Sequence, residues 1–260
     1  MLGAIVGDVI GSIYEWDNIK TKDFELVNEG CYFTDDTVLT VALAESILSG
    51  ESFASVMKRY YRRYPGCGYG GRFEEWAGSN DSRPYNSWGN GAAMRISPVG
   101  YAFESLQAVL AHAESFTAVT HNHPAGIKGG QAVAAAVFLG RTGSSKQSIK
   151  KYLSQAFHYD LTNTVDNLRL TYEFDESCQK TVPEALICFF ESTSFEDAIR
   201  NAISIGGDSD TIACITGAVA EAFYGGVPAD IADQVTKKLS PQLLGVCQKF
   251  TKLYIQKNAA

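Results

Sequence analysis

Several features that mark common classes of protein are scarce or missing in this sequence. Its 260 residues contain 22 Lys and Arg against 29 Asp and Glu, a formal net charge of −7, so there is no basic excess for nonspecific binding to nucleic acid. No apolar run is long enough to span a membrane, and the N-terminal run is interrupted by Asp8 and lacks the basic start of a signal peptide. We therefore expect a cytoplasmic protein with no membrane association.

Clustered cysteines and strand patterns are also lacking. The 6 cysteines are scattered, with no close pair of the kind that binds zinc, so we interpret them as free thiols in a reducing compartment. Strand-type alternation is scarce, and there is no internal repeat or low-complexity tract. Apolar residues recur at helical spacing, which predicts an all-α protein. The helical runs span residues 2–14, 38–48, 52–64, 97–118, 125–139, 145–156, 182–190, 195–204, 212–224, 229–239 and 241–255.

Two turns that precede helical runs are unusually rich in oxygen-bearing side chains. A helix cap needs one such side chain, whereas each of these turns carries two carboxylates and a hydroxyl, and neighbouring carboxylates repel one another. Hard divalent cations neutralise such clusters, and Mg²⁺ or Mn²⁺ suits oxygen ligands better than Zn²⁺ does. We therefore favour a metal site over capping alone. These acidic turns consist of Thr34, Asp35 and Asp36 and of Asp208, Asp210 and Thr211.

The acidic turns lie almost at opposite ends of the chain. If they share one metal site, the N- and C-terminal segments must pack together, so we predict a single domain over residues 1–260. The first helical run carries Gly3, Gly7 and Gly11 on one face. Such a face lets a neighbouring helix approach closely, and we expect it to be a packing surface.

Glu15 follows the first helical run and stands next to Trp16. A carboxylate beside aromatic side chains often has a raised pKa and can take part in acid-base catalysis. A solvent-facing glutamate at a helix end is the common alternative. The sequence leaves both interpretations open.

The glycine-rich segment 65–90 shows little periodicity, so we expect a long loop, and long loops are often functional. It leads into Gly89, Asn90 and Gly91, whose backbone N–H groups can bind an anion such as a pyrophosphate, although such glycines also occur in plain turns. Trp88 can stack on a base or simply pack. His121 is a candidate ligand contact or a hydrogen-bonded structural histidine.

Together these motifs resemble the ADP-ribosylglycohydrolase family over nearly the whole chain. No single motif is specific, but their combination in this order is. The resemblance implies a compact all-α domain, an orthogonal helical bundle, with two Mg²⁺ or Mn²⁺ ions at the mouth of a cleft. It rests on Gly7 to Gly11 with Glu15, on the two acidic turns, on Gly89 to Arg95, and on Thr120 with His121.

The resemblance also assigns roles. Glu15 matches an acidic residue near the scissile bond, and we expect Glu15 or an acidic ligand, with Asp35 as our candidate, to transfer the proton. The metal ligands match Thr34, Asp35, Asp36, Asp208, Asp210 and Thr211. The positions that cradle the pyrophosphate and ribose or otherwise contact ligand match Ser87, Trp88, Gly89, Asn90, Gly91, Met94 and His121.

The implied reaction is hydrolysis of the N- or O-glycosidic bond between ADP-ribose and a protein side chain or a small molecule. Two alternatives remain open at this point. One is a metal-dependent nucleotide phosphohydrolase, because carboxylate-bound metals also cleave phosphate esters. The other is a non-catalytic ADP-ribose-binding relative, because a fold alone does not prove activity.

Overall fold

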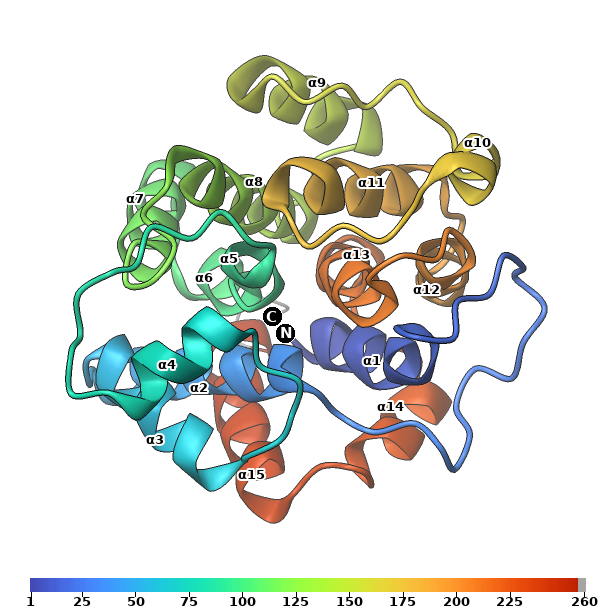
Figure 1. Ribbon diagram of the computed structural model, residues 1–260. Helices are drawn as coiled ribbons and strands as arrows, with labels where there is room; N and C mark the ends of the chain where they lie inside the picture. The colour runs from blue at the N-terminus through green and yellow to red at the C-terminus, as the bar shows by residue number, and fades with distance from the viewer. Residues whose placement is uncertain (257–260) are drawn as a thin grey trace.

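The structure, a computed structural model, describes residues 1–256, and these form helices joined by loops (Figure 1). Within residues 1–256 there is no strand, and the isolated antiparallel pairing of Gly89 with Ser177 joins two loops. The predicted all-α fold is confirmed. In chain order the elements are α1 (Leu2–Gly11), η1 (Ser12–Tyr14), α2 (Asp35–Ser49), α3 (Phe53–Arg63), α4 (Gly71–Gly78), α5 (Gly91–Met94), α6 (Ser97–Ala102), α7 (Leu106–Thr117), α8 (Pro124–Arg141), α9 (Lys146–Phe157), α10 (Val165–Thr171), α11 (Cys178–Glu191), α12 (Phe195–Ser204), α13 (Ser209–Tyr224), α14 (Ala229–Thr236), α15 (Pro241–Phe250) and η2 (Thr251–Ile255).

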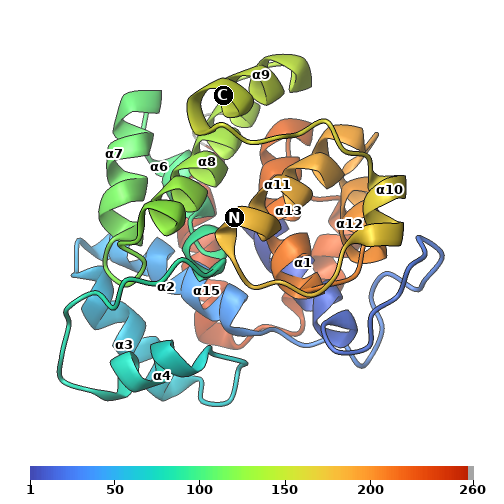
Figure 2. The same ribbon diagram turned by 45° about the horizontal axis from the view of Figure 1, so that its top comes forward.

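Helix α13 lies in the middle of the molecule. Every residue from Ser209 to Ala222 is buried, as expected for a helix that is apolar on all sides. Helices α8, α11 and α12 pack against it on one side and α1 on the other, and Figures 1 and 2 both show α1 beside α13. The buried apolar residues of the described chain belong to one hydrophobic cluster. The position of the start of α13 is therefore set by the core.

The glycine face of α1 allows this close contact. A Cβ atom added to Gly7 would lie 1.9 Å from the carbonyl oxygen of Ala213, and one added to Gly3 would lie 2.2 Å from that of Gly217. On α13, Gly217 faces Gly3 in turn, with 2.1 Å from its added Cβ to the Gly3 oxygen. The prediction of a packing surface is confirmed, and it brings the N-terminal helix against a helix near the other end of the chain.

Two sequence expectations about the connections need correction. The segment 65–90 is not one long loop, because it contains α4, whose Phe73 and Trp76 are buried against neighbouring aromatic rings such as Tyr69. No helical run was expected over α10 either. Both helices are 8 residues or shorter, and so few residues hold too few apolar positions to display a helical period.

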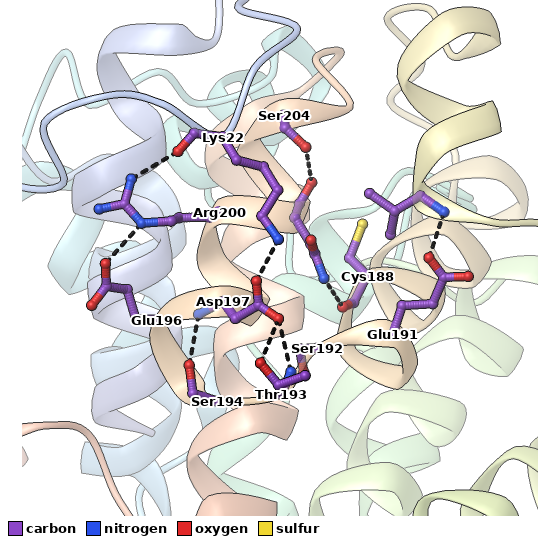
Figure 3. A network of polar contacts seen from close by, with 12 residues as sticks. Lys22, Cys188, Glu191, Ser192, Thr193, Ser194, Glu196, Asp197, Arg200 and Ser204 are labelled. Carbon is purple, nitrogen blue, oxygen red and sulfur yellow. Dashed lines mark hydrogen bonds and ion pairs between the residues drawn. The ribbon is translucent and has the colours of Figure 1, made fainter.

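The segment that joins α1 to α2 is tied to α12, as Figure 3 shows. The Arg200 guanidinium donates to the carbonyls of Lys22, at 2.9 Å, and Phe24, at 2.8 Å, and also pairs with Glu196. Lys22 forms an ion pair with Asp197. The part of the connection around Lys22 and Phe24 is therefore held at the surface of α12.

Two further sequence expectations concern cysteines and membrane spans. All six cysteines are free, and Cys67 is the one that is not fully buried. Over residues 1–256, none of the helices combines the length and the apolar character that crossing a bilayer would require.

Candidate functional site

The two acidic turns meet at one place in the fold. Thr34 is the N-cap of α2, where its hydroxyl accepts the N–H of Asp36, and Asp208 is the N-cap of α13. Because α1 packs on α13, the carboxylates of Asp8, Asp36 and Asp210 come within 4.8 Å of one another. A second group of three consists of Glu15, Asp208 and Asp210, with the same spacing. Asp210 therefore belongs to both groups.

Asp8 is a site residue that the sequence analysis did not single out. It is fully buried and accepts hydrogen bonds from the backbone N–H groups of Thr34 and Thr37, both at 3.0 Å, and from both hydroxyls. Asp8 thus caps α2 from a neighbouring helix. Burial raises its pKa to about 6 even though these hydrogen bonds oppose the shift. The available signal was a lone carboxylate inside an apolar, glycine-rich helix.

The carboxylates of the site repel one another, and the charge of Arg95 offsets this repulsion only in part at Asp35. Burial first, and then repulsion from neighbouring carboxylates, raises the pKa values of Asp35, Asp36 and Asp210 well above the ordinary range. Burial and the Asp208 charge raise the pKa of Glu15 to about 7. Oδ1 of Asp36 is buried without a hydrogen-bond partner. This all-oxygen donor set fits a hard divalent cation such as Mg²⁺ or Mn²⁺ better than Zn²⁺.

These carboxylates form one end of a cleft of about 280 Å³. The other end is built by short elements and carries two arginines. Arg95 is buried and donates to the hydroxyl of Thr120 at 2.6 Å, and Arg72 lies over the ring of Tyr85, 5.2 Å from its centroid. The cleft is thus acidic at one end and basic at the other. Such a cleft suits an anion that also carries uncharged oxygen atoms able to bind a metal ion.

His121 is a neutral hydrogen-bonding group at the basic end. Burial, followed by the charges of Arg95 and Arg72, lowers its pKa well below 6.5. Nδ1 lies 3.0 Å from a guanidinium nitrogen of Arg95, which can only donate, so Nδ1 accepts and the proton is assigned to Nε2. A Cβ added to Gly91 would lie 3.2 Å from Nε2. His121 therefore presents an N–H donor to the glycine turn of the cleft.

Comparison with known proteins identifies the family of the chain. Residues 1–259 match the family model described as ADP-ribosylglycohydrolase. The chain belongs to this family. The human protein named ADP-ribosylhydrolase ARH3 is 27% identical over 309 residues, covering 86% of this chain and 84% of that protein. The Pseudomonas putida protein named ADP-ribosylarginine hydrolase Tri1 is 26% identical over 281 residues, covering 90% of this chain and 72% of that protein.

A solved structure described as an ADP-ribosylglycohydrolase-related protein complex has the same fold. Its TM-score is 0.74 at 23% identity, and the match covers 97% of this chain and 96% of that chain. The predicted fold and the resemblance to the ADP-ribosylglycohydrolase family are both confirmed.

In this member of the ADP-ribosylglycohydrolase family, most of the predicted site residues face the same cleft. Asp35 lies at its wall, where the charge of Asp208 contributes to the raised pKa, so the acidic turns are close. Asn90 is also part of the acidic end, because its side-chain amide donates to Asp208 at 2.6 Å. The predicted residues that line the cleft are Glu15, Asp35, Asp36, Ser87, Gly89, Asn90, Gly91, Met94, His121, Asp208, Asp210 and Thr211.

Two predicted residues do not line the cleft. Thr34 is buried beneath it and donates to Asp8 at 2.6 Å. Trp88 is 47% exposed and packs against the ring of His123, with 5.4 Å between centroids. Arg72, Arg95 and Glu176 line the cleft without having been predicted as site residues. Arg95 ends the Gly89 to Arg95 motif but was given no role, and no motif marks the segments of Arg72 and Glu176.

Proposed function

We propose that this protein hydrolyses the glycosidic bond that links ADP-ribose to a protein side chain or a small molecule. The family and the names of its relatives support ADP-ribosyl hydrolysis. The observation that carries the proposal is a pair of three-carboxylate clusters, both containing Asp210, at one end of a cleft whose other end is basic. A sugar with a pyrophosphate suits both surfaces, because the acidic end could hold ions that bind the sugar hydroxyls and the basic end could hold the pyrophosphate.

Two divalent ions, Mg²⁺ or Mn²⁺, are the proposed cofactor of the acidic end. We propose the predicted ligands, and we add Asp8 because it belongs to a cluster of three carboxylates that could hold an ion. When bound, such ions would offset the carboxylate charge and polarise the ribose hydroxyls and water next to the scissile carbon. The predicted ligands are Thr34, Asp35, Asp36, Asp208, Asp210 and Thr211.

Glu15 is the proposed acid-base group. A pKa of about 7 lets its carboxyl hold or release a proton near neutral pH, as general acid-base catalysis requires. In the proposed reaction the bond from the anomeric carbon to the acceptor atom breaks, and the protonated Glu15 gives its proton to that atom. Ionised Glu15 then takes a proton from the water that adds to the anomeric carbon. Asp35 remains the alternative base.

The basic end is proposed to hold the pyrophosphate. Gly89 and Gly91 leave the backbone open to an approaching anion, and His121 presents its N–H beside them. The buried charge of Arg95 lies behind this histidine and favours an anion in the cleft. Ser87 and Met94 line the same surface. In the proposed complex the ribose lies next to the carboxylates.

A panel of arginine-linked and serine-linked ADP-ribosyl peptides, incubated with Mg²⁺, with Mn²⁺ and with a chelator, tests the proposal. We expect free ADP-ribose in the presence of one of the ions and none with the chelator. Asp208→Asn and Asp35→Asn should abolish the release. AMP in place of ADP-ribose would favour the phosphohydrolase, and binding of ADP-ribose without any product would favour a non-catalytic relative. A cytoplasmic location is part of the proposal.

A further inference from the structure

Asn18 connects two parts of the cleft that are far apart in sequence. Its side-chain oxygen accepts the N–H of Gly207 at 2.7 Å, and its amide donates to the carbonyl of Gly207 at 2.9 Å. The same amide donates to the carbonyls of Tyr14, at 2.6 Å, and Glu15, at 3.0 Å. One exposed side chain thus bonds to the backbone at Glu15 and to the backbone directly before Asp208.

The turn held by Asn18 is unusual in its backbone conformation. Gly206 and Gly207 have φ values of 68° and 77°, a left-handed conformation that glycine adopts without a Cβ clash. On its other side the turn meets Tyr172, because a Cβ on Gly207 would lie 2.4 Å from the ring. Lys20 donates to the carbonyls of Ile205 and, at 2.9 Å, Tyr172. The turn is therefore packed on one side and hydrogen-bonded on the other.

A tie at this place has a physical reason. The carboxylates of Glu15, Asp208 and Asp210 lie within 4.8 Å of one another, and like charges at this spacing repel. Asp208 and Asp210 begin a buried helix and cannot move apart. Glu15 instead lies at the end of η1, and the residue after it, Trp16, is 77% exposed. Repulsion would be relieved most easily by moving the Glu15 segment outward.

We propose that Asn18 is a positioning residue that holds the Glu15 backbone against the Gly207 turn and so keeps the Glu15 carboxyl beside Asp208. This inference rests on the proposed role of Glu15 in ADP-ribosyl hydrolysis. Asn18 touches no reacting atom and acts through Glu15. Its loss should therefore impair the proton transfer and leave the basic end, which binds the pyrophosphate, intact.

The experiment compares Asn18→Ala with Asn28→Ala, a control on the same connecting segment whose side chain accepts only the nearby Gly30 N–H and the Cys31 thiol. We expect Asn18→Ala to lower kcat about tenfold to a hundredfold, as for a small displacement of a reacting group, with KM changed less than about threefold. Asn28→Ala should keep the wild-type kcat. Asn18→Asp retains the acceptor for the Gly207 N–H but loses the donors, and it should fall between the two.

A double-mutant comparison separates positioning from general loss of structure. If Asn18 acts through Glu15, then Glu15→Gln with Asn18→Ala should be no slower than Glu15→Gln alone. Multiplication of the two effects, or a wild-type kcat in Asn18→Ala, would overturn the positioning role while leaving the proposed function in place. Wild-type protein that releases no ADP-ribose would instead overturn the proposed function.

Hydrogen exchange at the Gly207 amide gives a readout that does not depend on activity. We expect faster exchange at this amide in Asn18→Ala and an unchanged rate in Asn28→Ala. Unchanged protection in Asn18→Ala would show that the tie does not hold the turn, and the inference would fail even if the enzyme were active.

Discussion

The two ends of the cleft are built in different ways. The acidic end is formed by the starts of α2 and α13 and by a side chain of α1, three helices that pack in the core. The basic end is formed by residues near the short helices α4 and α5 and by the loop before α8. Core packing fixes the helices that carry the side chains of the first end, whereas the second end depends on hydrogen bonds such as that from Arg95 to Thr120.

The ends also differ in how their charges are compensated. At the basic end the two arginines have partners, since Arg95 contacts Thr120 and His121, and Arg72 lies over Tyr85. At the acidic end the carboxylates face one another, and their pKa values are raised. The acidic end thus carries mutual repulsion that costs stability, while each arginine at the basic end contacts a polar or aromatic group.

Asp210→Asn should have the largest effect on the acidic end, because Asp210 belongs to both clusters of three carboxylates. We expect release of ADP-ribose to fall about a thousandfold or more, as when other essential groups are removed. Without divalent ions the variant should unfold at the same temperature as the wild type or higher, since one repelling charge is gone. Asp233→Asn, at an exposed position on α14, should change neither quantity. A variant that is unstable without ions would show that the carboxylates do not repel.

Gly7→Ala should break the acidic end by separating the helices that form it. The added Cβ would lie 1.9 Å from the carbonyl oxygen of Ala213, which is backbone and cannot rotate away. We expect a loss of about 3 kcal/mol in the free energy of unfolding, together with loss of activity because Asp8 moves. Gly245→Ala, inside α15 with open space around it, should be neutral or slightly stabilising. Urea unfolding of both variants measures the difference.

The acidic end was largely predictable from sequence because its signals are local. Carboxylates and hydroxyls directly before apolar helical runs define the starts of α2 and α13, and such capping patterns depend on neighbours in the chain. Gly7 and its partners likewise indicate a packing face by their spacing alone. Asp8 was not predicted as a site residue because its role depends on which helix packs beside α1. The sequence of α1 alone does not identify that helix.

The basic end was harder to predict because most of its signals are not local in the sequence. The backbone at Gly89 and Gly91 gave a recognisable anion motif, but Arg72 and Arg95 reach the cleft only through tertiary contacts. Helix α4 is short and was hidden in a glycine-rich segment, so the position of Arg72 had no periodic signal. Trp88 is the opposite case, because it precedes Gly89 in the sequence but does not line the cleft.

Added Mg²⁺ or Mn²⁺ should stabilise the protein through the acidic end. A ligand at a hundred times its dissociation constant contributes about 2.7 kcal/mol, and a protein of this size gains roughly 2 to 4 °C in Tm for each kcal/mol. We expect a rise in Tm that depends on ion concentration and is absent from Asp210→Asn. Sodium chloride at matched ionic strength serves as the control. An equal rise with sodium would mean that the ions screen charge without occupying a site.

His121→Ala tests the basic end. Losing one N–H donor to an anionic ligand should weaken ADP-ribose binding about tenfold, which is roughly 1.4 kcal/mol, without changing the rise in Tm with Mg²⁺. The pKa of His121 lies well below 6.5, so the imidazole stays neutral and should add no pH dependence to binding between about pH 6 and 8. His112→Ala, on the exposed side of α7, is the control. Calorimetric titration with ADP-ribose measures both effects.

Glu184 offers a half-buried carboxyl outside the cleft for comparison with the clustered ones. Burial raises its pKa from 4.5 to about 7, and its Oε2 has no hydrogen-bond partner. The folded state therefore keeps this proton to higher pH than the unfolded state does, and stability present below pH 4.5 is lost as the pH rises through about 7.

Glu184→Gln mimics the protonated form of Glu184. Its effect on stability should distinguish this carboxyl from the clustered carboxylates of the cleft. We expect equal stability of variant and wild type near about pH 4.5, and about 1–2 kcal/mol in favour of the variant near pH 8. Glu74→Gln, at an exposed position on α4, should show no such pH-dependent difference. Because Glu184 belongs to neither cluster of three carboxylates that could hold an ion, the difference should persist when Mg²⁺ is added. Its disappearance would mean that the stabilising ion is not confined to the acidic end of the cleft.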